Sequence, residues 1–316
     1  MTRAITALAR PRITPGMFHT SSRVSALERV LRPLPGPVSE AVLATAAIAD
    51  GLVHATRFRR ARAWAAAQPG VGQPPWRLAL ALLANHGRFC AEEAFLGVSR
   101  LEDLPRGVIL EGQAHLDVAG GAILLGFHLG SPQAWFHLRA LGYPVRFAGR
   151  LARKAGDPRW AEALQAREVI RLPEGSPQER MRGLYHIRDL LRDGAMVFLT
   201  ADGPFGREAF RIDLPGGPLV VRRGWLALRS LTRVPTLPVL AHRDGRHHII
   251  VVHPALPPPA VDLARDAAQC RAALTPLIES YVRRFPAQCR YLALPPWPAS
   301  PDDETIGALD SEGRAT

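Results

Sequence analysis

Between residues 107 and 252 the sequence alternates short apolar runs with longer amphipathic segments. The runs are rich in Val, Ile, Leu and Phe and are bounded by Gly, Pro or charged residues, as buried strands are. Alternation of such runs with helical segments is typical of an α/β fold. We predict strands at seven places: Gly107–Glu111, Ala122–Phe127, Val145–Ala148, Val169–Leu172, Ala195–Thr200, Thr236–Ala241 and His247–Val252.

Helical periodicity and helix-start signals predict the remaining elements. They fall at Val38–Ala67, Pro74–Leu96, Pro132–Leu141, Pro177–Asp193, Leu219–Leu231 and Pro259–Arg284. Ser176, Pro177 and Glu179 form a capping box with proline at the first helical position. We therefore expect a mixed, mostly parallel central sheet flanked by helices, with a helical N-terminal region. The expected boundaries are a poorly ordered basic lead-in at 1–37, the helical region at 38–105, the α/β domain at 106–298 and a disordered tail at 299–316.

The first predicted helix combines an apolar period with a basic end. Arg57, Arg59, Arg60 and Arg62 crowd its last turns. Such a helix can lie on a membrane surface, or its apolar face can cover the main domain. No apolar stretch approaches the roughly 20 residues that span a bilayer, and no signal-peptide pattern is present. We expect any membrane association to be peripheral.

Composition supports a globular, strongly basic protein. The chain has 316 residues, 47% of them hydrophobic, and a formal net charge of +12. Lys154 is its single lysine, so arginine carries nearly all of the positive charge. A basic surface attracts polyanions, either nucleic acid or an anionic membrane. Because no nucleic-acid-binding motif accompanies the charge, we expect a membrane surface and no nucleic-acid partner.

The clearest candidate for chemistry is His128. It ends the apolar run Ala122–Phe127, and Ser131 and Pro132 then start a helix with Gln133 in its first turn. Ligands of α/β proteins bind in the crevice beyond the carboxyl ends of the strands. His128 is therefore a candidate catalytic residue, although a histidine at this place can also only pack or cap.

A second loop follows the strand Ala195–Thr200. It contains Asp202 and Gly203 and leads to Arg207 and Arg211. Arginine side chains match phosphate oxygens bidentately, so both arginines could hold an anionic group. Arg150, at the end of the strand Val145–Ala148, is a further candidate for this basic rim. On its own, Asp-Gly-Pro is also an ordinary turn.

The other polar features carry less chemistry. His247 and His248 are neighbours on one predicted strand, so their side chains point to opposite faces. One exposed and one buried histidine is the ordinary expectation, and it implies no function. The three cysteines have no metal-ligand spacing. No Gly-x-Ser-x-Gly elbow surrounds Ser131, which disfavours a serine hydrolase. We expect no metal.

Several motifs occur in an order that resembles the lysophospholipid acyltransferase superfamily, and within it the late lipid A acyltransferases. They are Leu110–Leu116, Gly121–Gly130 with His128, the Leu190–Gly194 segment, Asp202-Gly203-Pro204, Val234–Val239 and Ile278–Gln288. The resemblance covers about residues 75 to 295. It implies an α/β acyltransferase that moves a fatty acyl group from an acyl carrier protein or coenzyme A thioester to a hydroxyl of a lipid acceptor.

The resemblance also implies where the protein works and what it needs. The reaction would take place at the cytoplasmic face of the inner membrane, on a glycolipid or lysophospholipid. The resemblance makes His128 the general base. From their places after the strands, we expect Arg150, Asp202, Gly203, Arg207 and Arg211 in substrate binding. Because a thioester is already activated, removal of the hydroxyl proton is the main remaining task, and no cofactor is expected.

The family motif places an acid five residues after the histidine, where this chain has Gln133. A glutamine carbonyl can orient the ring but offers no charge to the imidazolium. Three alternatives follow: a slower enzyme with Gln133 as orienter, an enzyme that uses another acid such as Asp202, or a family member that binds lipid or a protein partner without catalysis.

Overall fold

The computed structural model describes residues 36–96, 107–117, 120–131, 134–149, 169–172, 177–203, 208–245 and 247–294. The predicted lead-in at 1–37 lies outside these residues except for Gly36 and Pro37, which begin a helix, and the predicted tail at 299–316 lies outside them as well. The described part is built around a seven-stranded sheet with the order β1-β9-β8-β2-β5-β3-β4. Its strands are β1 (Val108–Glu111), β2 (Ala122–Gly126), β3 (Val145–Gly149), β4 (Val169–Arg171), β5 (Met196–Thr200), β8 (Thr236–Asp244) and β9 (His247–Val252).

The sheet is mixed and mostly parallel, as the sequence predicts. Strand β9 runs antiparallel to β8, whereas the other neighbouring pairs are parallel. Strand β2 lies in the middle, and all five of its residues are buried. Buried residues on both faces explain why its sequence is a continuous apolar run rather than an alternating one.

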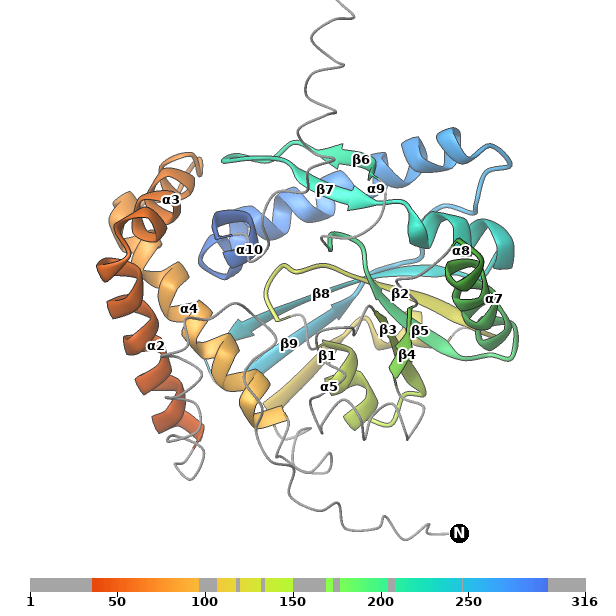
Figure 1. Ribbon diagram of the computed structural model, residues 1–316, viewed down its shortest axis with the longest axis horizontal. Coiled ribbons are helices and arrows are strands. Elements are labelled where there is room, and N and C mark those ends of the chain that lie inside the picture. The colour runs from red at the N-terminus through yellow and green to blue at the C-terminus, as the bar shows by residue number, and fades with distance from the viewer. Residues whose placement is uncertain are drawn as a thin grey trace, which may run out of the picture.

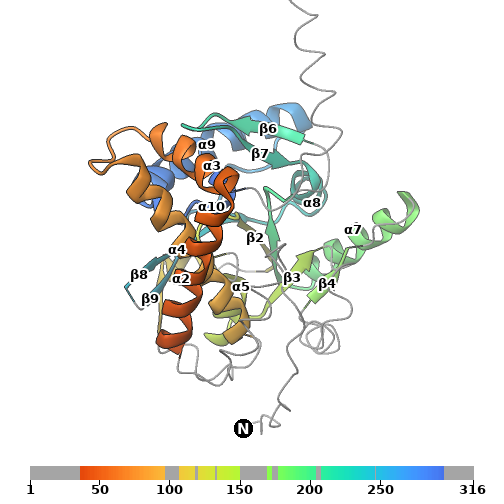
Figure 2. The same ribbon diagram turned by 60° about the vertical axis from the view of Figure 1, so that its left-hand side comes forward.

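Helices cover both faces of the sheet (Figure 1). They are α2 (Gly36–Val53), α3 (Ala55–Ala66), α4 (Pro75–Leu96), α5 (Ala134–Ala140), α7 (Pro177–Arg192), α8 (Gly224–Thr232) and α9 (Leu263–Arg284), followed by the short α10 (Arg290–Ala293). Ile123 and Leu125 of β2 join a cluster with residues of α3, α4, α7, α8 and α9, while Ala122 and Leu124 join a cluster with α5. Helices α2, α3 and α4 lie together on one side of the molecule, which comes forward in Figure 2.

The predicted helix Val38–Ala67 is two helices rather than one. Helices α2 and α3 meet at an angle of 101° at His54. The bend turns Ala61, Trp64 and Ala65 of α3 into the core, which a straight continuation of α2 would not do. Tertiary packing therefore decides where this apolar segment bends.

The predicted helix Leu219–Leu231 is also wrong in its first part. Residues Leu219–Arg222 form strand β7, which pairs antiparallel with β6 (Glu208–Ile212) in a separate two-stranded sheet. Leu219 and Val221 are buried and alternate with half-buried neighbours, which is the period of a strand. The helix α8 begins only at Gly224.

Among the described residues, no single helix is long and apolar enough to cross a membrane. The bent pair Pro37–Val53 and Ala55–Ala66 meets the criterion when its length and composition are taken together.

Candidate active site

The register of two neighbouring strands brings His128 and Asp202 together. Strands β2 and β5 are parallel, with Gly126 opposite Thr200. The backbone N–H of Ala201 donates to the carbonyl of Gly126 at 2.9 Å, so the pairing continues past the strand ends. Two residues beyond the Gly126–Thr200 pair lie His128 and Asp202, at the carboxyl edge of the sheet where α/β proteins bind ligands.

Asp202 holds His128 at both its backbone and its ring. Its carboxylate oxygens accept the backbone N–H of His128 at 3.0 and 2.9 Å, and Oδ1 lies 2.9 Å from the ring nitrogen Nδ1. An ionised carboxylate can only accept, so Nδ1 must carry the proton of this hydrogen bond. In the neutral ring the lone pair is then on Nε2, which is the tautomer that a general base needs.

The two side chains of the pair differ in solvent exposure. The side chain of Asp202 is 4% exposed, whereas that of His128 is 15% exposed. The carboxylate therefore lies behind the imidazole, and the imidazole is the group that a substrate would meet. A carboxylate in this place also stabilises the positive charge that the ring gains when it takes a proton.

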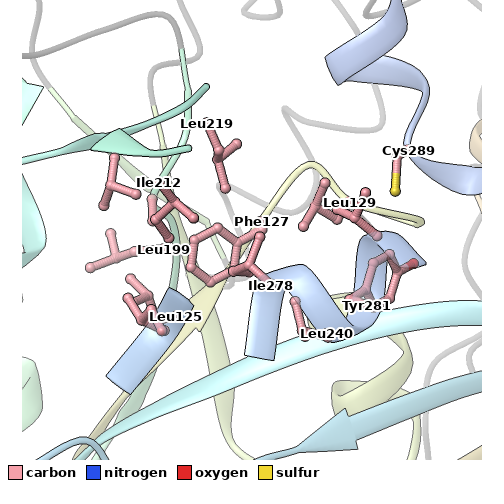
Figure 3. Packing of buried hydrophobic residues seen from close by; sticks show 14 of the residues in the cluster. Leu125, Phe127, Leu129, Leu199, Ile212, Leu219, Leu240, Ile278, Tyr281 and Cys289 are labelled. Carbon is pink, nitrogen blue, oxygen red and sulfur yellow. The ribbon is translucent and has the colours of Figure 1, made fainter. Parts of the chain in front are cut away.

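The residues on either side of His128 anchor it in the core. Phe127 and Leu129 are buried at 3% and 1% exposure and pack into the same cluster as Leu199 and Ile278 (Figure 3). Gly130 then turns the chain with φ +67°, and a Cβ on it would lie 1.9 Å from the carbonyl oxygen of Ala241. Only glycine fits this turn, because it combines a left-handed conformation with close backbone contact.

Two residues that the sequence analysis did not select support the site. Arg222 donates its backbone N–H to Ala201 at 2.7 Å and its Nε to the carbonyl of Gly203 at 2.9 Å, so strand β7 fixes the Asp202 loop. The ring of Tyr291 meets the His128 ring edge to face at 5.2 Å between centroids. Arg222 was hidden in a predicted helix, and no local pattern marks Tyr291.

The remaining predicted site residues are placed as follows. A Cβ added to Gly203 would lie 3.9 Å from Cε1 of His128, so Gly203 adjoins the ring. Arg211 donates to the Glu208 carboxylate through Nε and Nη2, at 2.8 and 3.0 Å. Gln133, Arg150 and Arg207 lie outside the described residues, and their predicted roles stay predictions. For the acid beside His128, the described contacts support Asp202.

A second polar cluster contacts Ser131, which follows His128 by three residues. The Ser131 hydroxyl donates to Oε1 of Glu92 at 2.6 Å, and Nε2 of His137 and Nδ1 of His248 lie 3.3 and 3.6 Å from the same oxygen. Burial alone raises the pKa of Glu92, but the neighbouring imidazoles and the Ser131 hydrogen bond lower it to about 2. Glu92 is therefore an ionised carboxylate inside the protein.

Of the comparisons with known proteins, the one with solved structures gives matches. No protein-family model and no curated protein sequence matches the chain. A solved structure that resembles it is the 1-acyl-sn-glycerophosphate (LPA) acyltransferase PlsC from Thermotoga maritima, with a TM-score of 0.42 and 12% sequence identity. The match covers 83% of this chain and 97% of that chain. The function of this chain must therefore be argued from its own residues.

Proposed function

We propose that the protein is an O-acyltransferase that moves a fatty acyl group from a thioester to a hydroxyl of a lipid acceptor. The observation that carries the proposal is the His128–Asp202 pair at the carboxyl edge of the central strands, with Nδ1 2.9 Å from the carboxylate. The resemblance of the surrounding motifs to lysophospholipid acyltransferases supports the choice of reaction.

In this reaction Nε2 of His128 takes the proton of the acceptor hydroxyl as its oxygen attacks the thioester carbonyl carbon. A new ester C–O bond forms, the C–S bond breaks, and the imidazolium returns its proton to the leaving thiolate. Asp202 keeps Nδ1 protonated and stabilises the imidazolium between the two transfers. The pair thus supplies general base and general acid in turn, a contribution of about 10²- to 10⁴-fold in rate.

This arrangement also bears on the catalytically silent alternative. The absence of an acid at position 133 favours a lipid-binding member of the family without turnover. The contact with Asp202 supports an active enzyme instead, because a carboxylate already meets the ring from the neighbouring strand. In an active enzyme of this kind, Gln133→Glu should change turnover little; a silent protein would show no turnover in either form.

A peripheral membrane location fits the surface of the N-terminal helices. Leu52 and Val53, at the end of α2, are 52% and 74% exposed, and Arg59 and Arg60 are exposed on α3. Exposed apolar side chains beside arginines suit the headgroup region of an anionic bilayer. The proposed acceptor is therefore a lipid in the cytoplasmic leaflet of the plasma membrane, where acyl carrier protein and coenzyme A thioesters are accessible.

The test is acyl transfer by the purified protein. Palmitoyl-CoA or palmitoyl-acyl carrier protein is mixed with vesicles of a bacterial lipid extract, with and without added lysophospholipid, and mass spectrometry detects lipids that gain one acyl chain. We expect a product with the wild type and with His186→Ala, an exposed histidine on α7, and at least about a 100-fold lower rate with His128→Ala.

Two results would contradict the proposal. Equal rates for His128→Ala and wild type would remove His128 as the base. Thioester hydrolysis without a lipid product would show that water rather than a lipid hydroxyl is the acceptor. Vesicle binding gives a separate readout: salt-sensitive retention on anionic vesicles, but not on duplex DNA, is expected.

A further inference from the structure

Glu92, His137 and His248 converge from three elements that are far apart in the sequence. Glu92 belongs to α4, His137 to α5 and His248 to the strand β9. Each offers one oxygen or nitrogen atom, and these atoms all lie within 4.8 Å of one another. The rings of His137 and His248 are stacked, with centroids 4.8 Å apart and planes inclined by 29°.

The separations suit a small tetrahedral ion. Zinc binds imidazole nitrogen and carboxylate oxygen at about 2.0–2.2 Å, so two ligand atoms around it lie roughly 3.3–3.5 Å apart. Nε2 of His137 and Nδ1 of His248 lie 3.3 and 3.6 Å from Oε1 of Glu92. The carboxylate is thus already at ligand spacing from both rings. The stacked rings would have to turn and approach each other for both lone pairs to point at one ion.

A buried carboxylate oxygen of the cluster lacks a partner. Oε2 of Glu92 has no hydrogen-bond partner among the residues that the structure describes, and Glu92 is only 6% exposed. A buried polar atom without a partner costs about 1–3 kcal/mol. A cation that both carboxylate oxygens coordinate would satisfy Oε2, while the lone pairs of the two rings would complete three ligand positions.

We propose that Glu92, His137 and His248 form a binding site for one divalent transition-metal ion, with zinc as the best fit. Two imidazoles and one carboxylate are ligands of this class, whereas magnesium and calcium prefer oxygen alone. The side chains of Glu92 and His137 are 6% and 4% exposed and that of His248 is 17% exposed, so the ion would lie mostly inside the protein with three protein ligands. The ion would join α4 and α5 to strand β9.

The site is connected to the active site through Ser131. Its hydroxyl donates to the coordinating oxygen of Glu92, and it follows His128 by three residues across the Gly130 turn. Partners that hold a metal ligand from outside usually contribute about 10- to 100-fold to metal affinity. The ion would thus stabilise the turn that carries His128 without taking part in acyl transfer.

The experiment uses the full chain without a polyhistidine tag, freed of metal by a chelator. Zn²⁺ is titrated in by calorimetry, and Co²⁺ replaces it to report geometry by its visible absorption. We expect one ion per chain, the intense visible bands of tetrahedral cobalt, and a higher melting temperature with Zn²⁺. His248→Asn should weaken binding by at least about 100-fold, and Ser131→Ala by about 10- to 100-fold.

His247→Asn is the matched control, because His247 precedes His248 on the same strand but is exposed. It should bind Zn²⁺ as the wild type does. His248 is partly exposed near the start of β9, and circular dichroism of metal-free His248→Asn verifies its fold. Absence of stoichiometric binding by the wild type, or equal affinity in His248→Asn and wild type, would overturn the site.

Discussion

The His128–Asp202 pair and the Glu92–His137–His248 cluster place histidines beside carboxylates by different means. The pair follows two neighbouring parallel strands whose register continues from Gly126 and Thr200 to the two residues. The cluster joins helices α4 and α5 and the strand β9, which are far apart in the sequence and meet only in the folded chain. The carboxylate is buried in both groups, and each group has one partly exposed histidine, His128 at 15% and His248 at 17% exposure.

The two arrangements suit different roles: the pair suits proton transfer with a substrate, and the cluster suits support of the fold. A histidine that exchanges protons with a substrate must reach the surface of a crevice, and His128 does so with its carboxylate behind it. In the cluster the polar atoms of Glu92, His137 and His248 face one another within 4.8 Å, an arrangement that can hold separate elements together. Changes to the pair should therefore affect turnover, and changes to the cluster should affect stability and metal binding.

The largest expected effect is on the pair alone. Asp202→Asn should lower kcat by about 10²- to 10⁴-fold, because an amide offers no charge to the imidazolium and its NH2 group can face Nδ1 and favour the wrong tautomer. Binding of Zn²⁺ should not change. Initial rates with palmitoyl-CoA and the calorimetric titration measure the two properties. Asp213→Asn, an exposed carboxylate, is the control, and a kcat within threefold of wild type in Asp202→Asn would refute the role of Asp202.

The next change should damage both regions, since Gly130 lies between His128 and Ser131. Gly130→Ala places a Cβ against the carbonyl of Ala241 at a positive φ, and we expect it to lower the free energy of unfolding by about 2 kcal/mol or more. Gly142→Ala is the control: it has φ +95° with no atom within 4 Å of the added Cβ. Urea denaturation measures both, and equal losses would mean that close contact at Gly130 contributes nothing.

A third measurement tests His86, which lies beside Arg290. Burial, together with the charges of Arg290 and Arg57, lowers the pKa of His86 to about 3. Below pH 6.5 the unfolded chain binds a proton that the folded chain does not, so the free energy of unfolding falls toward pH 3. One such group contributes at most about 1.4 kcal/mol per pH unit.

His86→Asn should make this pH dependence less steep. The amide oxygen can still accept from Nη1 of Arg290, which lies 3.2 Å from Nδ1 of His86, but it does not titrate in this range. Denaturation at pH values from 4 to 7 measures the slope, with His186→Asn on the exposed face of α7 as the control. Identical slopes in His86→Asn and wild type would show that the pKa of His86 is the same in the folded and the unfolded chain.

The smallest expected effect concerns Gly203, which adjoins the His128 ring. Gly203→Ala adds a methyl group at ordinary contact distance, 3.9 Å from the His128 ring, without a positive φ. The free energy of unfolding should change by less than about 0.5 kcal/mol. If acceptors approach His128 past Gly203, the KM for a lipid acceptor rises while the unfolding midpoint stays the same. An unchanged KM would place the acceptor on another side of the ring.

Much of the fold can be predicted from the sequence because its strands are short and bounded by turn residues. The predicted strands Ala122–Phe127 and Ala195–Thr200 correspond to β2 and β5, and both candidate loops follow them directly. The prediction is wrong where a pattern is too short to show its period, as in Leu219–Arg222, or where packing bends a helix, as at His54.

The sequence by itself determined the apolar strands and the placement of His128 and Asp202 at strand ends, because these depend on local backbone preferences and on burial. Only the tertiary structure decided that β2 and β5 are neighbours in the register that joins these residues. It alone also brought Glu92 and His137 to the inward-facing His248, since strand order and helix packing depend on contacts between residues far apart in the chain.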